Sequence, residues 1–223
     1  DVVPTDCLAK ALADEGSSAM ELEIAFMGQG GVSQGTLKTA VEQMGMGGLV
    51  RRDGQVVEVP PGWTTRTVDF GDHPRTVISI PWGDVATAGH STGIPNITVY
   101  TYLPQLGRQL LRWSRYVQGL LAWRPLQRLL QRLVEAYVSN PSPETRRTGR
   151  TLVWASVRDE RGQTTEKRLR GPEAYTFTAR TAVMAAERVL NGTAPPGYQT
   201  PATAFGSDFV FDVEGVQYVS LGN

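Results

Sequence analysis

The sequence is short of the residues that build metal sites and disulfides. Its 223 residues include one cysteine, Cys7, and two histidines, His73 and His90. A single cysteine excludes an intrachain disulfide and a cysteine-built zinc site, and two histidines leave little material for a metal cluster. We therefore expect no metal in the site and a reduced, cytoplasmic setting.

Net charge and long apolar runs are missing as well. The 22 basic and 22 acidic residues cancel, so no overall charge favours nucleic acid as a partner. No apolar run approaches the roughly 20 residues that a membrane-spanning helix needs. The hydrophobic content of 40% and the charged content of 20% are typical of a globular domain.

The residues that are present predict an α+β fold, with a largely antiparallel or mixed sheet and flanking helices. Asp53-Gly54 is the strongest hairpin signal, and Ser33 is expected to cap a helix. Thr5 or Asp6 is expected to cap the first helix, and an irregular tail is expected from Pro195. Strands are expected at 20–27, 49–52, 55–59, 66–70, 75–80, 97–102, 150–159 and 164–169, and helices at 4–15, 34–44, 83–91, 105–138 and 172–190.

The segment 76–101 is the first candidate for a site, because two apolar strands enclose a polar, glycine-rich connection. His90 suits general acid chemistry near neutral pH, although a lone histidine is more often solvated. Asp84 is either a catalytic carboxylate or, as we favour, a helix N-cap. Asn96 either fixes a turn or holds a ligand carbonyl. The candidate side chains of this connection are Trp82, Asp84, His90, Ser91, Thr92 and Asn96.

Two other patterns are weaker. Gly28-Gln-Gly-Gly31 follows a strand and precedes a helix, but its spacing is not that of a dinucleotide fingerprint, so we interpret it as a turn. Ser91 follows His90 directly, and adjacent residues seldom face each other as a nucleophile and its base.

The segment 105–138 is rich in arginine, leucine and tryptophan, and meets no acid until Glu135. One interpretation is a helical pair that covers the sheet and exposes a basic face to solvent. The alternative is a peripheral membrane contact through residues 105–134, because arginine beside leucine and tryptophan is typical of interfacial helices.

A series of short motifs resembles one family. The sequence resembles the saccharopine dehydrogenase-like oxidoreductases, in particular the trans-acting enoyl reductase branch, along nearly its whole length. The motifs, in the family's order, are Asp1-Val-Val-Pro-Thr-Asp-Cys7, Gly35-Thr36, Arg51-Arg-Asp-Gly54, Val68-Asp-Phe-Gly71, Ile80-Pro-Trp-Gly-Asp84, Ser91-Thr-Gly-Ile-Pro-Asn96 and Gly197-Tyr-Gln-Thr-Pro201.

The resemblance implies a two-domain dehydrogenase, in which a Rossmann domain binds NAD(P) and a second domain shapes the substrate pocket. The Rossmann fingerprint is absent from this sequence, so we expect it to be the second domain alone, inactive without the other. Residues 1–16 are then a segment leaving the Rossmann domain, 17–172 the substrate and dimerisation domain with the helical insertion 105–138, and 173–223 a C-terminal helix and tail.

The resemblance also suggests roles for the candidates. His90 and Asp84 are the catalytic candidates, and the substrate-binding candidates are Trp82, Ser91, Thr92, Asn96, Ser33 and Thr36. The expected partners are the Rossmann domain, a small-molecule or lipid-like substrate and a second copy of the chain in a homodimer. The alternative, from a different class, is a non-catalytic module that binds lipid or another protein.

Overall fold

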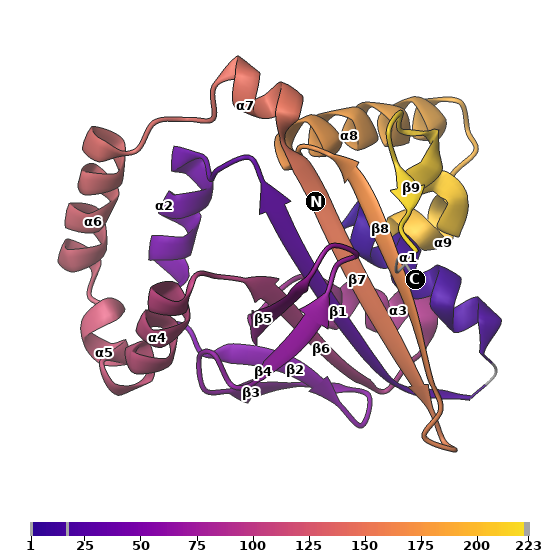
Figure 1. The fold of residues 1–223 in the computed structure, drawn as a ribbon, viewed down its shortest axis with the longest axis horizontal. Coiled ribbons are helices and arrows are strands. Elements are labelled where there is room, and N and C mark those ends of the chain that lie inside the picture. Colours follow the sequence, from indigo (N-terminus) through magenta and orange to yellow (C-terminus); the bar gives the residue numbers. More distant parts are fainter. Residues whose placement is uncertain (1, 17, 221–223) are drawn as a thin grey trace.

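The structure is a computed structural model that describes residues 2–16 and 18–220. Within these residues the strands form one nine-stranded mixed sheet in the order β3-β2-β6-β1-β7-β8-β9, and β5 pairs with both β4 and β6 (Figure 1). Among the described pairings β1 and β6 are parallel, and the other pairs are antiparallel. The strands are β1 (Ala19–Gln29), β2 (Gly48–Arg52), β3 (Gln55–Val59), β4 (Thr65–Asp69), β5 (Pro74–Ser79), β6 (Asn96–Tyr102), β7 (Arg150–Asp159), β8 (Thr164–Pro172) and β9 (Gln217–Tyr218).

Helices flank this sheet, which confirms the predicted fold class. Three of them, α4 to α6, lie at one side of the molecule, away from the long strands β1 and β7 (Figure 1). The helices are α1 (Val3–Glu15), α2 (Gln34–Gln43), α3 (Asp84–Thr92), α4 (Gln105–Trp113), η1 (Ser114–Tyr116), α5 (Gln118–Leu121), α6 (Arg124–Tyr137), α7 (Pro143–Thr148), α8 (Ala174–Leu190), α9 (Pro201–Phe205) and η2 (Ser207–Asp212).

The two faces of the sheet have separate cores because side chains alternate along β1. Leu22 and Ile24 face the main core, which α1, α3, α8 and α9 cover. Ala25 and Met27 belong to a smaller core on the opposite face, where the β4–β5 hairpin covers them together with Trp154. The second core occupies only part of its face, and the remainder is polar.

The β2–β3 hairpin has the turn that its sequence predicts. Asp53 and Gly54 both have positive φ angles, 48° and 78°, and Arg52 pairs with Gln55 across them. Two positive φ angles define a type I′ turn, whose twist matches that of the flanking strands. The amide of Gly54 also donates to the carbonyl of Pro95 over 2.9 Å, so the turn is tied to the chain just before β6.

Two predictions about the ends of the chain are wrong. No side chain caps α1, whose N-cap is Val2. The predicted irregular tail instead forms α9, η2 and β9, and Ala202, Phe209 and Val210 from it are buried in the main core. The helices in this segment are too short for a periodic apolar pattern to predict them. Their apolar residues are buried because they pack on the surface of α1. Asp1, at the start of the first motif, lies outside the described residues.

Candidate functional site

Ser91 lies on the buried side of α3, where it fastens α3 to α1. Its hydroxyl donates to Oδ1 of Asp6 over 2.6 Å, and Oδ2 of Asp6 accepts from the amide of Ala202 over 2.8 Å. All three residues are buried. The structure therefore uses Ser91 to join α1, α3 and α9, a contact that its sequence position does not reveal.

Asp84 begins α3 without capping it, since the N-cap is Gly83 and no side chain bonds to the first turn. The side chain is fully buried, and neither carboxylate oxygen has a hydrogen-bond partner among the described residues. Burial raises the pKa of Asp84 to about 7; the nearby Thr5 hydroxyl lowers it in part, and the negative charge of Asp6 raises it further. The carboxyl has the pKa of a general acid and is buried, and its catalytic role stays a prediction.

The other candidates from α3 and its preceding loop have different surroundings. Trp82 packs on the main core, with its ring 4.9 Å from that of Phe26. Thr92 donates to a carbonyl one turn earlier in α3 over 2.5 Å. His90 is exposed and meets the edge of Tyr198, with their ring centres 4.8 Å apart. Trp82 and Thr92 are half-buried, whereas His90 is exposed, and its role as a proton donor stays a prediction.

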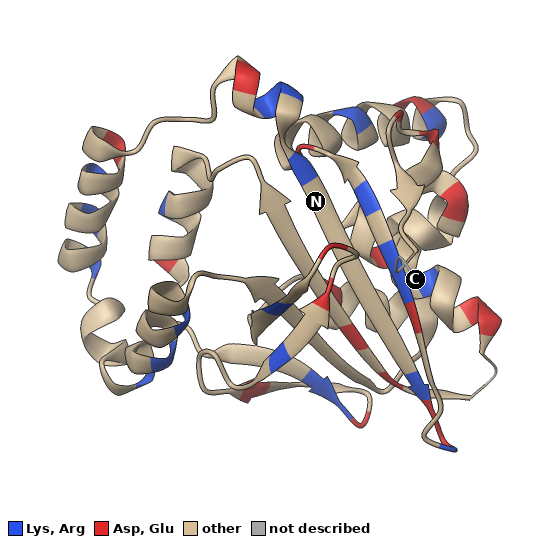
Figure 2. Ribbon diagram, viewed as in Figure 1, with Lys and Arg blue, Asp and Glu red and all other residues tan. Residues whose placement is uncertain are grey.

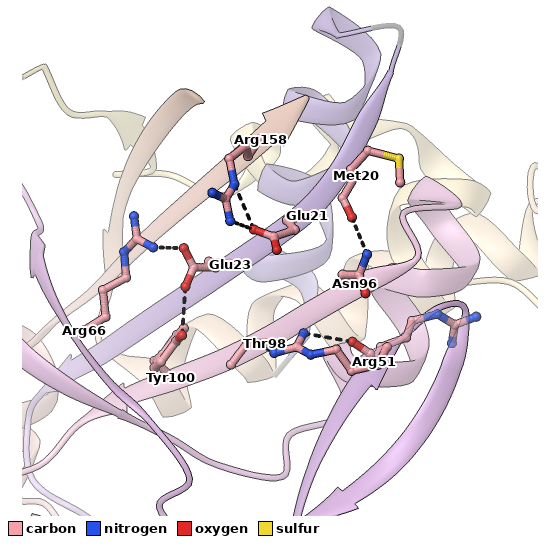
Figure 3. A network of polar contacts seen from close by, with 10 residues as sticks. Met20, Glu21, Glu23, Arg51, Arg66, Asn96, Thr98, Tyr100 and Arg158 are labelled. Atoms are coloured by element: carbon pink, nitrogen blue, oxygen red, sulfur yellow. Dashed lines mark hydrogen bonds and ion pairs between the residues drawn. The ribbon is translucent and has the colours of Figure 1, made fainter. Parts of the chain in front are cut away.

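Asn96 fixes the start of β6, which is one of the two roles left open for it. Its amide group donates to the carbonyl of Met20 over 3.0 Å (Figure 3). Its Oδ1 accepts from the amide of Asp53 over 3.1 Å. The side chain thus connects β1, β6 and the β2–β3 turn, and both of its polar ends are occupied.

Ser33 and Thr36 lie at the N-terminus of α2 and share the hydroxyl of Tyr175. Ser33 caps the helix as predicted, accepting from the amide of Thr36 over 3.2 Å. The amide of Ser33 donates to Oη of Tyr175 over 2.6 Å, and the Thr36 hydroxyl lies 2.9 Å from the same oxygen. The predicted residues therefore do not form one hydrogen-bonded cluster within the described chain.

A different set of side chains does come together, on the polar part of the second sheet face (Figure 3). Glu21 and Glu23 lie two residues apart on β1, so they share one face of the sheet, and each contacts a guanidinium group. Glu21 accepts from Nε of Arg158 over 2.9 Å, and Glu23 pairs with Arg66. Glu23 also accepts from the hydroxyl of Tyr100 over 2.8 Å. Burial raises the pKa of Tyr100, so this phenol stays protonated and remains a hydrogen-bond donor.

The network continues across β7 and β8. The guanidinium of Arg66 lies over the ring of Trp154 at 5.1 Å, and the indole of Trp154 donates to Glu166 over 3.1 Å. Arg168 donates to Glu166 over 2.7 Å and also to the carbonyl of Asp69. Stacked, paired arginines of this kind lose little entropy on binding, because their planes are already held in place.

This polar face is hollowed in two places. A hollow of about 120 Å³ is lined by Glu21, Glu23, Arg66, Ser156, Arg158 and Thr164. A wider one of about 310 Å³ lies between β8 and the tail and is lined by Glu166, Lys167, Arg168, Tyr218, Val219 and Ser220. Both hollows present carboxylate and cationic groups side by side, an arrangement that matches a ligand carrying charges of both signs.

Sequence reasoning missed this network although one signal was present. Glu21 and Glu23 occupy the polar side of an amphipathic strand, a pattern normally explained by solvent. Their partners lie far away in the sequence, Arg66 on β4 and Arg158 on β7. Only the folded sheet brings these four residues together, so no local pattern could have paired them.

Comparison with known proteins gives a structural match. No family model matches the sequence, and no curated protein matches it. Among solved structures, the apo form of histidine-tagged saccharopine dehydrogenase (L-Glu forming) from Saccharomyces cerevisiae aligns with 97% of this chain and 72% of its own, at a TM-score of 0.53 and 11% identity. The chain therefore has a fold similar to that of the aligned part of this enzyme. At this identity the match establishes the fold alone.

The described residues do not fit a dinucleotide at α2, the helix that follows the Gly28-Gln-Gly-Gly31 segment. The turn predicted for this segment is wrong in its first half, because Gly28 and Gln29 are the last residues of β1. A pyrophosphate would need the free amides of that helix N-terminus. Three of these amides are already bonded: that of Ser33 to Tyr175, that of Gln34 to Asn140 over 3.0 Å, and that of Thr36 to the Ser33 hydroxyl. The described part of the chain also shows no group of three or more acidic, histidine or cysteine side chains placed to hold a metal.

Proposed function

We propose that this chain is the substrate-binding domain of an NAD(P)-dependent oxidoreductase of the saccharopine dehydrogenase-like type. The observation that carries the proposal is the paired carboxylate and guanidinium network on the second sheet face, in a chain whose fold matches a saccharopine dehydrogenase over 97% of its length. The trans-acting enoyl reductase branch, suggested by the sequence motifs, is a narrower form of the same proposal.

The substrate class follows from the chemistry of the network. Arg66 and Arg158 suit the carboxylates of a ligand, and Glu21 and Glu23 suit its ammonium group. We therefore expect a small amino-acid-like substrate rather than a lipid. The residues of this chain bind and orient that substrate, while hydride chemistry belongs to NAD(P) held by a dinucleotide-binding domain outside the described residues.

The test of this binding face is a titration of the chain, labelled with ¹⁵N, with saccharopine and separately with L-glutamate at millimolar concentration. Amide signals of β1 and β7 and the indole signal of Trp154 should shift. Arg158→Gln should weaken binding roughly 10- to 100-fold, the value of a lost charge-assisted hydrogen bond. Arg161→Gln, in the exposed β7–β8 turn, is the matched control and should leave binding unchanged. Shifts confined to other surfaces, or no shifts, would contradict the proposed face.

A second prediction concerns the cofactor. Fluorescence titration of this chain alone with NADH and NADPH should show no saturable binding, because the α2 amides that would hold a pyrophosphate are bonded to protein groups. Micromolar binding of either nucleotide by this chain would show that it carries its own cofactor site. That result would leave the substrate face untouched but would remove the need for another domain.

A further inference from the structure

The helical arm formed by α4, η1, α5 and α6 (residues 105–137) exposes an unusual number of large apolar side chains. Single exposed leucines are ordinary on a protein surface, but a contiguous series marks an interaction site. Leu106 and Trp113 of α4 are 66% and 70% exposed, and none of the four helices has a buried residue. The exposed apolar residues of the arm are Leu106, Leu110, Trp113, Tyr116, Val117, Leu120, Trp123, Leu129, Leu133 and Tyr137.

The helix α6 turns only part of its apolar surface toward the body of the protein, where Leu126, Leu130 and Val134 are half-buried. An amphipathic helix normally packs its apolar stripe on the body of the protein. Here α6 contacts α2 through polar groups: Gln131 donates to the carboxylate of Glu42 over 2.9 Å, Gln127 donates to the backbone carbonyl of the same residue, and Glu135 pairs with Lys38. The side of α6 toward the body therefore combines these polar contacts with half-buried apolar residues.

A second row of apolar residues on α6 is left exposed. Leu129, Leu133 and Tyr137 are spaced four residues apart and therefore share one face. They are 54%, 44% and 83% exposed. Because the body of the protein covers only the half-buried row, this exposed apolar face is left for an external occupant.

The charge of the arm indicates which occupant fits. Figure 2 shows basic residues on α4 and α6, and Glu135 is the one acidic residue of the segment 105–137. Arg124, Arg128 and Arg132 form a row at four-residue spacing, and within residues 2–16 and 18–220 none of them forms an ion pair. A second copy of the arm would bring like charges together, whereas an anionic lipid surface neutralises them.

We propose that residues 105–137 dock peripherally on an anionic phospholipid surface. Leucine and tryptophan side chains enter the headgroup and acyl boundary, and the arginine row meets the phosphates. None of the described helices is long and apolar enough to cross a membrane, so the contact is interfacial. The arm is tied to the sheet through Arg108, which donates to the carbonyl of Thr76 in β5 over 3.3 Å, so docking places the whole domain at the surface.

The experiment is sedimentation of the full chain with vesicles of phosphatidylcholine alone and of equal parts phosphatidylcholine and phosphatidylglycerol. Binding should be strong to the anionic vesicles and weak to the neutral ones. The triple change Arg124→Gln, Arg128→Gln and Arg132→Gln should lower the partition coefficient roughly 100-fold, about fivefold for each charge. Arg146→Gln, Arg161→Gln and Arg170→Gln change three exposed arginines outside the arm and should have little effect.

The apolar component is tested separately. Leu129→Gln with Leu133→Gln should weaken vesicle binding by about tenfold or more, since the apolar area placed in lipid is lost. Val183→Gln with Val189→Gln, at exposed positions of α8, is the matched control. Brominated lipid in the anionic vesicles should quench tryptophan fluorescence, and Trp113→Phe with Trp123→Phe should remove most of that quenching.

Three outcomes would overturn the proposal. The first is equal binding to neutral and anionic vesicles, and the second is binding that the arginine changes leave intact. The third is absence of binding to either kind of vesicle. Light scattering would then show whether the chain is a monomer or a dimer that the leucine changes dissociate, and either result would overturn the proposal. None of these outcomes depends on the saccharopine or L-glutamate titration, so failure here leaves the proposed substrate face standing.

Discussion

Replacing Asp84 by asparagine should remove most of the dependence of stability on pH between about pH 4 and pH 7. The unfolded chain releases this proton near its ordinary pKa of 3.8, whereas burial raises the pKa of Asp84 in the folded protein to about 7. Between these values the unfolded state binds fewer protons, so the free energy of unfolding falls as the pH rises. The fall amounts to roughly 4 kcal/mol, because each tenfold change in an equilibrium constant is about 1.4 kcal/mol.

Urea unfolding at a series of pH values measures this effect. The buried amide group introduced by Asp84→Asn lacks partners, as the carboxyl does, so the variant carries a cost that is constant with pH. Stability of Asp84→Asn relative to the unmodified chain should therefore increase steadily from pH 4 to pH 7. A constant difference across that range would contradict the raised pKa.

Asp72 is the control, because its pKa is shifted in the opposite direction to that of Asp84. Its hydrogen bond with Arg75 lowers its pKa to about 2, so the stability that it contributes is lost only as the pH falls toward that value. Asp72→Asn should accordingly leave the change in stability between pH 4 and pH 7 as it is in the unmodified chain. Asp72 is largely exposed, and the effect of its removal should be small.

Replacing Asp6 by alanine should destabilise the protein by about 3 kcal/mol or more. The change leaves the buried amide of Ala202 without an acceptor and leaves the Ser91 hydroxyl only its longer bond, of 3.4 Å, to the carbonyl of Ala88 in its own helix. An unsatisfied buried group costs about 1–3 kcal/mol, and the loss of a hydrogen bond to a charged group costs a similar amount. Ser91→Ala removes one donor only and should cost less. Chemical denaturation at pH 7 measures both changes.

The matched control for Ser91→Ala is Thr178→Ala in α8. The Thr178 hydroxyl also bonds within its own helix, to the carbonyl of Ala174 over 2.9 Å, but it is exposed to solvent. Its loss should therefore alter stability by about 0.5 kcal/mol at most. An Asp6→Ala variant as stable as this control would show that the junction of α1, α3 and α9 does not depend on the carboxylate.

The candidate site illustrates where sequence reasoning succeeded and where it stopped. The segment 76–101 does form β5, α3 and β6, and its polar residues were visible in the sequence. Whether each is buried depends on what packs above α3, and that surface comes from α1 and from the tail near Ala202, at opposite ends of the chain. Ser91 and Asp84 were therefore given functional roles on the basis of their polarity, and the structure places both in the interior.

Partners that are distant in sequence were missed for the same reason. Tyr175 stands 142 residues from Ser33, and Arg158 stands 137 residues from Glu21. The register of β1 against β7 brings Glu21 opposite Arg158 and Glu23 opposite Ser156. A shift of one residue would turn these side chains to the other face, so the network is a property of strand register.

The local elements follow from the amino-acid sequence alone, because their signals are short in range. Alternation along β1, the Asp53-Gly54 turn, the Ser33 cap and the amphipathic arm all act within a few residues. Folding in three dimensions was needed to establish which polar groups meet, which carboxyl is buried and which side of α6 faces the body. Those outcomes depend on desolvation and pairing between segments far apart in the chain, and such interactions leave no periodic trace in the sequence.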